Sequence, residues 1–286
     1  MRARLINLAI YLAATLSGVL VLLYPFFRQV DPHQGGFGSV WVGQMPLMMT
    51  FLLGLCLLVL LFEAQGPMVN TKLIALLGVL VAINSALRFI ETAIPGPGGF
   101  TPIFFLIILV GYVFGGRVGF LMGALTLLVS ALVTGGVGPW LPAQMFTAGW
   151  VGMSAPLLRP VIRMISSKLG NPRLLAITEL SLLAVFGLLW GFLYGAIMNL
   201  WQWPFIAGPA GQSYAAGMGF VVIFQHYLAF YLVTSLVWDA AAAVGNILLI
   251  LAFGAPTLRA LRRFKQRFEF NYLPGVNAGS QQRGGA

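Results

Sequence analysis

The candidate functional residues of this chain are polar side chains near the ends of long apolar segments. Their types and spacing suit the binding of a ligand. A polar group is costly inside a membrane, so one that persists there is a candidate for a functional contact. Asn84, Arg88 and Glu91 recur at spacings of four and three, which places them on one helical face. We expect them to line a pocket mouth, with a simple pairing of Arg88 and Glu91 as the alternative.

Two further polar and aromatic clusters lie near segment ends. Glycines around residue 136 allow a tightly folded loop, in which Trp140 offers a large amphipathic surface and Gln144 offers a donor and an acceptor. The later cluster of candidate binding residues comprises Asn199, Trp201, Gln202, Tyr214 and His226. For the tryptophans and the histidine, a place in the belt at the membrane interface is the alternative. Asp239 lies deeper in an apolar stretch, where we expect it to hydrogen-bond another helix.

The acid-base inventory is too small and too scattered for an enzyme. Six acidic residues and two histidines are present, and their spacing matches no metalloprotease helix, carboxylate pair or nucleophile elbow. No glycine-rich phosphate loop of the Walker type occurs. The single cysteine, Cys56, lies in an apolar run, so neither a disulfide nor a cysteine-rich metal site is expected. We expect no catalysis, no metal and no cofactor.

The elements that must position these residues are membrane-spanning helices. The composition is 59% hydrophobic and 8% charged, which does not suit a soluble globule. A bilayer core about 30 Å thick needs roughly 20 apolar residues per helix. The sequence predicts an all-α integral membrane protein of about eight transmembrane helices, at residues 5–24, 46–63, 72–92, 101–115, 118–134, 144–162, 174–199 and 220–254. The last stretch is too long for one span, so a break is expected between Tyr227 and Ser235.

Basic residues indicate the orientation, because Lys and Arg are retained on the cytoplasmic side during insertion. With the N-terminus inside, only Arg28 and Arg88 of the 16 Lys and Arg residues fall on the outer side. Both termini are therefore expected in the cytoplasm, with outer loops at 25–45, 93–100, 135–143 and 200–219. The net charge of +10 is interpreted as a topology signal and not as a nucleic-acid surface. The basic segment 259–267 suits anionic lipid heads.

One helical face of the third predicted span is nearly flat. It carries small residues at intervals of three to four, namely Ala75, Gly78, Ala82 and Ala86. Small faces let helices approach closely in lipid, where packing drives association. The face either packs within the chain or docks another membrane subunit.

The motif around Trp140 is similar to one in a known family. Residues 136–145 read Gly-Val-Gly-Pro-Trp-Leu-Pro-Ala-Gln-Met, a glycine-rich segment at 111–123 precedes them, and Gly149-Trp-Val-Gly152 follows. Together they resemble the substrate-specific (S) components of energy-coupling factor (ECF) transporters, most closely the group assigned to cobalamin uptake. The resemblance covers about residues 72–268.

The resemblance implies a division of the chain and a set of partners. Residues 67–268 would form a six-helix substrate-binding core, preceded by two accessory helices in 1–66 and followed by a disordered cytoplasmic tail at 269–286. The core would bind a vitamin or related micronutrient, with cobalamin the first guess, under the loops that hold the polar clusters. Energy would come from a module of a membrane coupling subunit and two ATPase subunits, docked at an Ala-x-x-x-Ala pattern such as Ala82 to Ala86. The protein would then lie in the bacterial inner membrane.

Two other functions stay open at this point. An ion-coupled secondary transporter of a small organic solute would usually show inverted repeats and broken helices, although Asp239 and Glu179 are conceivable proton carriers. A non-transporting membrane scaffold would bind a protein partner and no small molecule.

Overall fold

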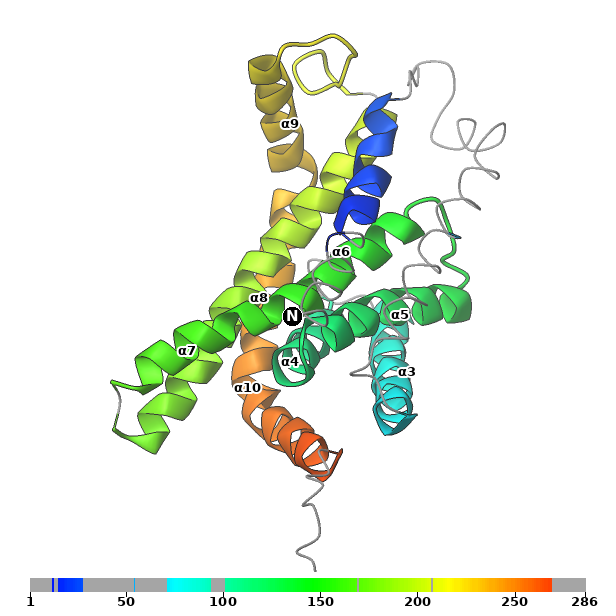
Figure 1. The fold of residues 1–286 in the computed structure, drawn as a ribbon. Helices are drawn as coiled ribbons and strands as arrows, with labels where there is room; N and C mark the ends of the chain where they lie inside the picture. Colours follow the sequence, from blue (N-terminus) through cyan, green and yellow to red (C-terminus); the bar gives the residue numbers. More distant parts are fainter. Residues whose placement is uncertain are drawn as a thin grey trace, which may run out of the picture.

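The computed structural model describes residues 12, 15–27, 54, 71–93, 101–168, 170–206 and 208–268, which contain no β-strand. The all-helical prediction is confirmed for these residues. Their α-helices with complete bounds are α3 (Thr71–Ala93), α4 (Ile103–Phe114), α5 (Gly116–Thr134), α6 (Leu141–Ser154), α7 (Leu158–Ser166), α8 (Pro172–Gln202), α9 (Phe220–Thr234) and α10 (Leu236–Phe268). Short 3₁₀ helices lie at η1 (Tyr24–Phe27), η3 (Ala155–Leu157) and η4 (Trp203–Phe205) (Figure 1).

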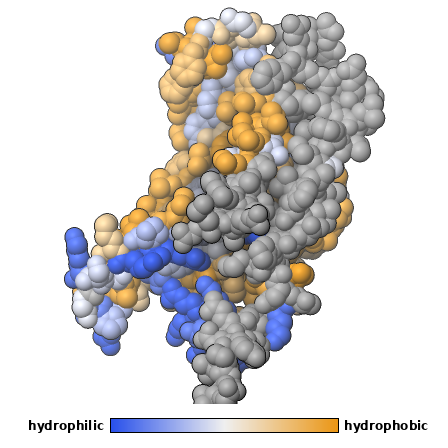
Figure 2. Space-filling view, viewed as in Figure 1, coloured by the Kyte–Doolittle hydropathy of each residue, from blue (hydrophilic) through white to orange (hydrophobic). Residues whose placement is uncertain are grey.

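Four of the described helices, α3, α5, α8 and α10, are long and apolar enough to cross a membrane. The helices α4 and α9 are apolar but shorter. Large apolar side chains face outward, among them Phe220 at 83% exposure and Val233 at 72%, as expected where the surrounding solvent is lipid. Figure 2 shows this apolar surface over the middle and upper parts of the molecule, with hydrophilic residues gathered at the lower end. The count of about eight spans stays a prediction, because the expected span 46–63 lies almost wholly outside the described residues.

Helix α4 is the centre of the core. Ile107, Ile108, Leu109 and Val110 follow one another in sequence, and each is completely buried. Four consecutive residues point around the whole circumference of a helix, so α4 is covered on every side. Its uniformly apolar sequence, IFFLIILVGYVF, is what such a position requires.

The pair α5 and α6 packs backbone against backbone. A Cβ atom added at Gly119 would lie 2.3 Å from the carbonyl oxygen of Gly152, and one added at Gly152 would lie 2.1 Å from the carbonyl oxygen of Gly119. Gly123 approaches the Ala148 carbonyl in the same way, and Gly111 of α4 approaches the Gly152 carbonyl, both at 2.1 Å for a built Cβ atom. These distances leave no room for any side chain. The helices α4, α5 and α6 therefore form one tight block.

The long helices α8 and α10 cross along a row of glycines. Gly187, Gly191 and Gly195 recur every four residues on the α8 face turned to α10. A Cβ atom at Gly191 would lie 2.5 Å from the Cα atom of Ala243. The side chain of Asn246 donates a hydrogen bond of 3.0 Å to the Gly187 carbonyl across this contact. Small residues thus allow the close approach that stabilises helix pairs in lipid.

The ends of the predicted spans agree in part with the structure. The span predicted at 72–92 corresponds to α3, and the break expected between Tyr227 and Ser235 occurs at Ser235, between α9 and α10. The span predicted at 144–162 is instead divided into α6, η3 and α7. Pro156 lies in η3, where its missing N–H and its ring prevent regular α-helical bonding. Hydropathy does not register this interruption because the segment remains apolar.

The predicted N-terminal helix at 5–24 is described in part. Residues 15–23 are helical and lie against α6, since a Cβ atom at Gly18 would be 2.4 Å from the Trp150 ring. The predicted tail at 269–286 lies outside the described residues. Helix α10 continues through the basic segment as far as Phe268.

Candidate functional site

A cavity of about 350 Å³ lies between the beginning of α6 and the end of α8. It is lined by Trp140, Gln144, Met198, Trp201 and Gln202. Four of these five residues belong to the sequence-predicted set, and they come from two clusters almost sixty residues apart in the chain. The structure therefore brings the loop before α6 and the end of α8 to one place.

The loop before α6 is shaped by its glycines. Gly135 ends α5 in the left-handed conformation, with φ of 68°, and its N–H donates to the Ala131 carbonyl. The indole of Trp140 folds back over Gly138, where a Cβ atom would lie 2.3 Å from the ring, and its Nε1 donates to the Gly136 carbonyl at 3.3 Å. A side chain at Gly138 would displace this ring. The motif Gly-Val-Gly-Pro-Trp thus fixes the direction of the Trp140 ring at the cavity wall.

A second cavity of about 300 Å³ adjoins the first, since Met198 and Gln202 line both. Its polar lining includes Asn199, Thr234, Ser235 and Asp239, from α8, α10 and the end of α9. Asp239 is 7% exposed and accepts a hydrogen bond of 2.8 Å from the Ser235 hydroxyl. Its carboxylate rests against Gly195, where a Cβ atom would lie 1.8 Å from Oδ1. Any larger residue at this position would require the carboxylate to move.

Asn199, one of the sequence-predicted residues, contributes its side-chain amide to the wall of the second cavity. Its Nδ2 donates to the Thr234 hydroxyl at 2.9 Å. Its Oδ1 is buried and has no hydrogen-bond partner among the described residues. Buried amide oxygens are normally bonded, so a lone one at a cavity wall invites a donor from a ligand.

Two other predicted residues hold the segment 208–219 in place and line neither cavity. The Tyr214 ring packs on Trp203 at 5.5 Å and on Phe26 at 5.0 Å between centroids, and its hydroxyl lies 3.4 Å from the Phe26 carbonyl. His226 Nδ1 donates to the Ser213 carbonyl at 3.0 Å. Both side chains are therefore used to shape the loop above the end of α8.

The three predicted residues of α3 have different positions. Asn84 is fully buried and donates through Nδ2 to the Ile103 carbonyl and to the Thr126 hydroxyl, both at 3.2 Å, so it joins α3 to α4 and α5. Arg88 and Glu91 are half-buried and line neither cavity.

The small face predicted for docking is exposed in the part of the chain that the structure describes. Ala75, Gly78, Ala82 and Ala86 are all exposed along α3. Around Gly78, a built Cβ atom meets nothing within 4 Å. Among the described residues this face is therefore exposed, and both alternatives for it stay predictions.

The site also contains residues that the sequence analysis did not select. Met198 belongs to both cavities, and Asp239 was expected only to bond another helix. Tyr194 is one of the large aromatic side chains of the second cavity, beside Phe104 and Trp238. Tyr194, Met198 and Gln202 are spaced by four residues, a pattern that places them on one helical face and could have indicated this wall of the site.

Comparison with known proteins agrees with this geometry. The family model described as "ECF transporter, substrate-specific component" matches residues 72–254. No curated protein and no solved structure matches the chain significantly.

Proposed function

Because this chain belongs to the family of substrate-specific components of ECF transporters, we propose that it binds a vitamin-type micronutrient with high affinity in the two adjoining cavities, and that cobalamin is the first ligand to test. The observation that carries the proposal is the convergence of Trp140 and Gln144 with Trp201 and Gln202 on one cavity. Aromatic walls with a few amides are typical of sites for ring-shaped ligands.

The chemistry of the second cavity narrows the ligand class. Asn199 Oδ1 and the Asp239 carboxylate are acceptors, so the ligand should present amide, amino or hydroxyl donors on that side. Cobalamin carries several amide side chains around a corrin ring, and it is larger than either cavity. It would therefore occupy both cavities, whereas a smaller vitamin would need only one.

The proposed transport complex follows from the family and from α3. We propose that a membrane coupling subunit docks on the open face of Ala75, Gly78, Ala82 and Ala86, and that two ATPase subunits supply energy from the cytoplasm. In this proposal the protein lies in the bacterial inner membrane with both termini inside. The cavities then open outward, because α8 runs for about 46 Å between its basic beginning and the cavity residues at its end.

The ligand is tested by thermal unfolding of the detergent-purified protein with cobalamin, riboflavin, thiamine, biotin, folate and pyridoxine. A ligand at 100 times its Kd stabilises the folded state by about 2.7 kcal/mol, which is a clear rise in Tm. We expect one compound to raise Tm and the others to leave it unchanged. If no compound does so, the vitamin proposal is wrong.

The site is tested with Gln144→Ala, which we expect to weaken binding of that compound by about tenfold, the value of one hydrogen bond of roughly 1.4 kcal/mol. Gln225→Ala is the matched control, because Gln225 is exposed on α9 and lines neither cavity. Asn199→Leu separates ligand sizes: it should weaken a ligand that spans both cavities and spare one confined to the first. If Gln144→Ala and the unaltered protein bind the compound with equal affinity, the compound does not bind in the first cavity and the proposed site is wrong.

Docking is tested with Ala82→Phe, which places a large ring on the flat face. We expect the coupling subunit and the ATPases no longer to co-purify, while ligand binding is retained. Ile83→Phe is the control, since Ile83 is 49% exposed on the same turn but off the small-residue row. Loss of the complex in both variants, or in neither, would contradict docking on this face.

A further inference from the structure

A third cavity, of about 320 Å³, lies at the opposite end of the molecule from the candidate substrate site. Its lining includes Tyr112 and Val113 at the end of α4, together with four cationic residues, Arg159, Arg163, Arg262 and Lys265. The cations come from two helices distant in sequence, α7 and α10. Neither the family match nor the proposed substrate site gives this cavity a role.

Two of the cations are held by the end of α4. Arg159 donates from Nε to the Tyr112 carbonyl at 2.7 Å and from Nη2 to the Val113 carbonyl at 2.9 Å. Lys265 Nζ donates to the same Val113 carbonyl at 3.2 Å. The last carbonyls of a helix lack partners within it and carry partial negative charge, so these bonds fix the cations at the cavity wall.

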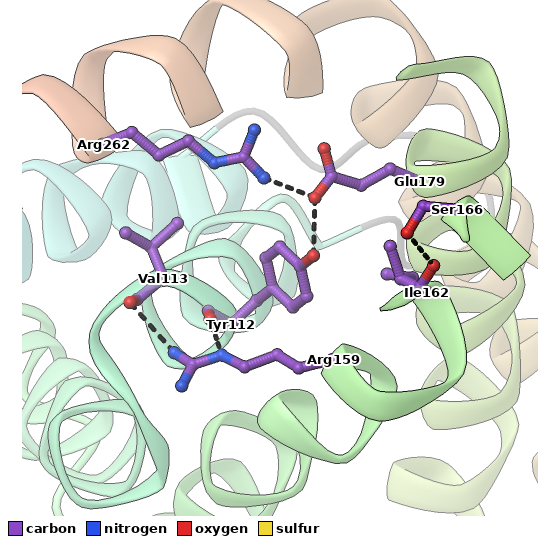
Figure 3. Close-up of polar contacts among 7 residues, drawn as sticks. All are labelled: Tyr112, Val113, Arg159, Ile162, Ser166, Glu179 and Arg262. Carbon is purple, nitrogen blue, oxygen red and sulfur yellow. Dashed lines mark hydrogen bonds and ion pairs between the residues drawn. The ribbon is translucent and has the colours of Figure 1, made fainter. Parts of the chain in front are cut away.

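One carboxylate, that of Glu179, contacts the lining of this cavity, which contains four cations. Glu179 accepts a hydrogen bond of 2.5 Å from the Tyr112 hydroxyl and forms an ion pair with Arg262. In Figure 3, Arg159 and Arg262 approach Tyr112 from opposite sides, with Glu179 beside its hydroxyl. The guanidinium of Arg163 has no hydrogen-bond or ion-pair partner among the described residues. A positive charge therefore remains at the cavity that no described group neutralises.

The surroundings indicate the kind of anion. The lower end of the molecule, where α7 and the end of α10 lie, is where the apolar surface gives way to hydrophilic residues (Figures 1 and 2). Lipid head groups occupy this level of a membrane, and basic pockets between helices bind their phosphates. Guanidinium groups match phosphate oxygens in a two-pronged geometry, which favours phosphate over a simple point anion.

We infer that this basic cavity is a binding site for a phosphate group, supplied by the head group of an anionic phospholipid. Arg163 binds the phosphate directly. Arg159 and Lys265 line the wall beside it, where their hydrogen bonds to the end of α4 hold them. The site is independent of the vitamin proposal, because its residues touch neither substrate cavity. Bound lipid would connect α4, α7 and α10 at one membrane surface.

The experiment measures native mass spectra and thermal unfolding of the full chain in detergent supplemented with phosphatidylglycerol, cardiolipin or phosphatidylcholine. We expect the two anionic lipids to bind and to raise Tm, and phosphatidylcholine to do neither. Arg163→Gln should reduce anionic-lipid affinity about tenfold, as expected for one charged hydrogen bond. Arg263→Gln is the matched control: it removes the same charge one residue from Arg262, on an exposed position outside the cavity lining.

Each outcome decides the proposal. Equal losses in Arg163→Gln and Arg263→Gln would show only diffuse attraction to a basic surface and would overturn it, as would equal binding of phosphatidylcholine. Arg163→Lys keeps the positive charge but removes the two parallel N–H donors of the guanidinium, so this variant should bind anionic lipid with intermediate affinity. Competition by inorganic phosphate or glycerol phosphate at millimolar concentration would assign the site to a soluble phosphate, whereas its absence assigns the site to lipid. If Arg163→Gln loses helicity, Lys265→Gln with the same control replaces it.

Discussion

Gly152→Val is expected to lower the stability of the α4–α5–α6 block by about 3 kcal/mol or more, the upper range for overpacked cores. The first added carbon would lie 2.1 Å from the Gly119 carbonyl oxygen, and that oxygen belongs to backbone that cannot rotate away. Relief requires α5 and α6 to separate, which would also open the contact with Gly111 of α4. The expected fall in Tm is roughly 10 °C, measured by circular dichroism in detergent.

The control for this change is Gly78→Ala. Gly78 is also in the middle of a helix, but a built Cβ atom there meets nothing within 4 Å. Alanine is the better helix former by about 1 kcal/mol, so this variant should be neutral or slightly more stable. If Gly152→Val were as stable as Gly78→Ala, the backbone contact between α5 and α6 would be wrong.

Trp203→Ala is expected to cost about 3–5 kcal/mol, the range for removing a buried large aromatic residue. Trp203 is completely buried, its ring packs on Tyr227 at 5.4 Å and on Tyr214 at 5.5 Å, and its Nε1 donates to the Gln212 carbonyl at 2.7 Å. Its loss releases the segment 208–219 from the end of α8, beside the candidate site. We therefore expect both a lower Tm and faster proteolysis within that segment.

Two controls separate the causes. Trp203→Phe keeps most of the ring packing but removes the hydrogen bond to the Gln212 carbonyl, so its cost should be smaller, about 1–3 kcal/mol. Trp238→Ala deletes the same side chain from a position that is 57% exposed, and it should leave proteolysis of the segment unchanged. Equal protease sensitivity in Trp203→Ala and Trp238→Ala would contradict the anchoring role of Trp203.

The helices themselves were largely predictable because their signals are local. Apolar length and the flanking glycines placed α3 within about one residue at each end, and they placed the break near Ser235 within the expected range. Pro156 was visible in the sequence, but hydropathy averages over it and predicted a single span. The glycines at 187, 191 and 195 recur every four residues in the sequence, which is itself a pattern that predicts a close helix contact.

The candidate site was predictable to the extent that residues at neighbouring helix ends meet. Trp140 and Gln202 were both assigned to the outer end of the bundle, and they line one cavity. Asn84 and Tyr214 could not be placed, since their partners Thr126 and Phe26 lie 42 and 188 residues away in the chain. A polar side chain in an apolar segment suits a ligand contact and a helix contact equally well, and only the fold distinguishes them.

The glycine contact between α5 and α6 also has a mechanical consequence. Where backbone lies on backbone, no layer of side chains is left to shift rotamers, so the two helices cannot slide past each other in small steps. A transport cycle would then carry α4, α5 and α6 as one stiff body. Motion that opens the cavities must fall to α9, of which Phe230 alone is buried among its described residues, and to its junction with α10 at Ser235. Helix α9, which is the helix held by the fewest buried side chains beside the cavities, is thus the element that can act as their gate.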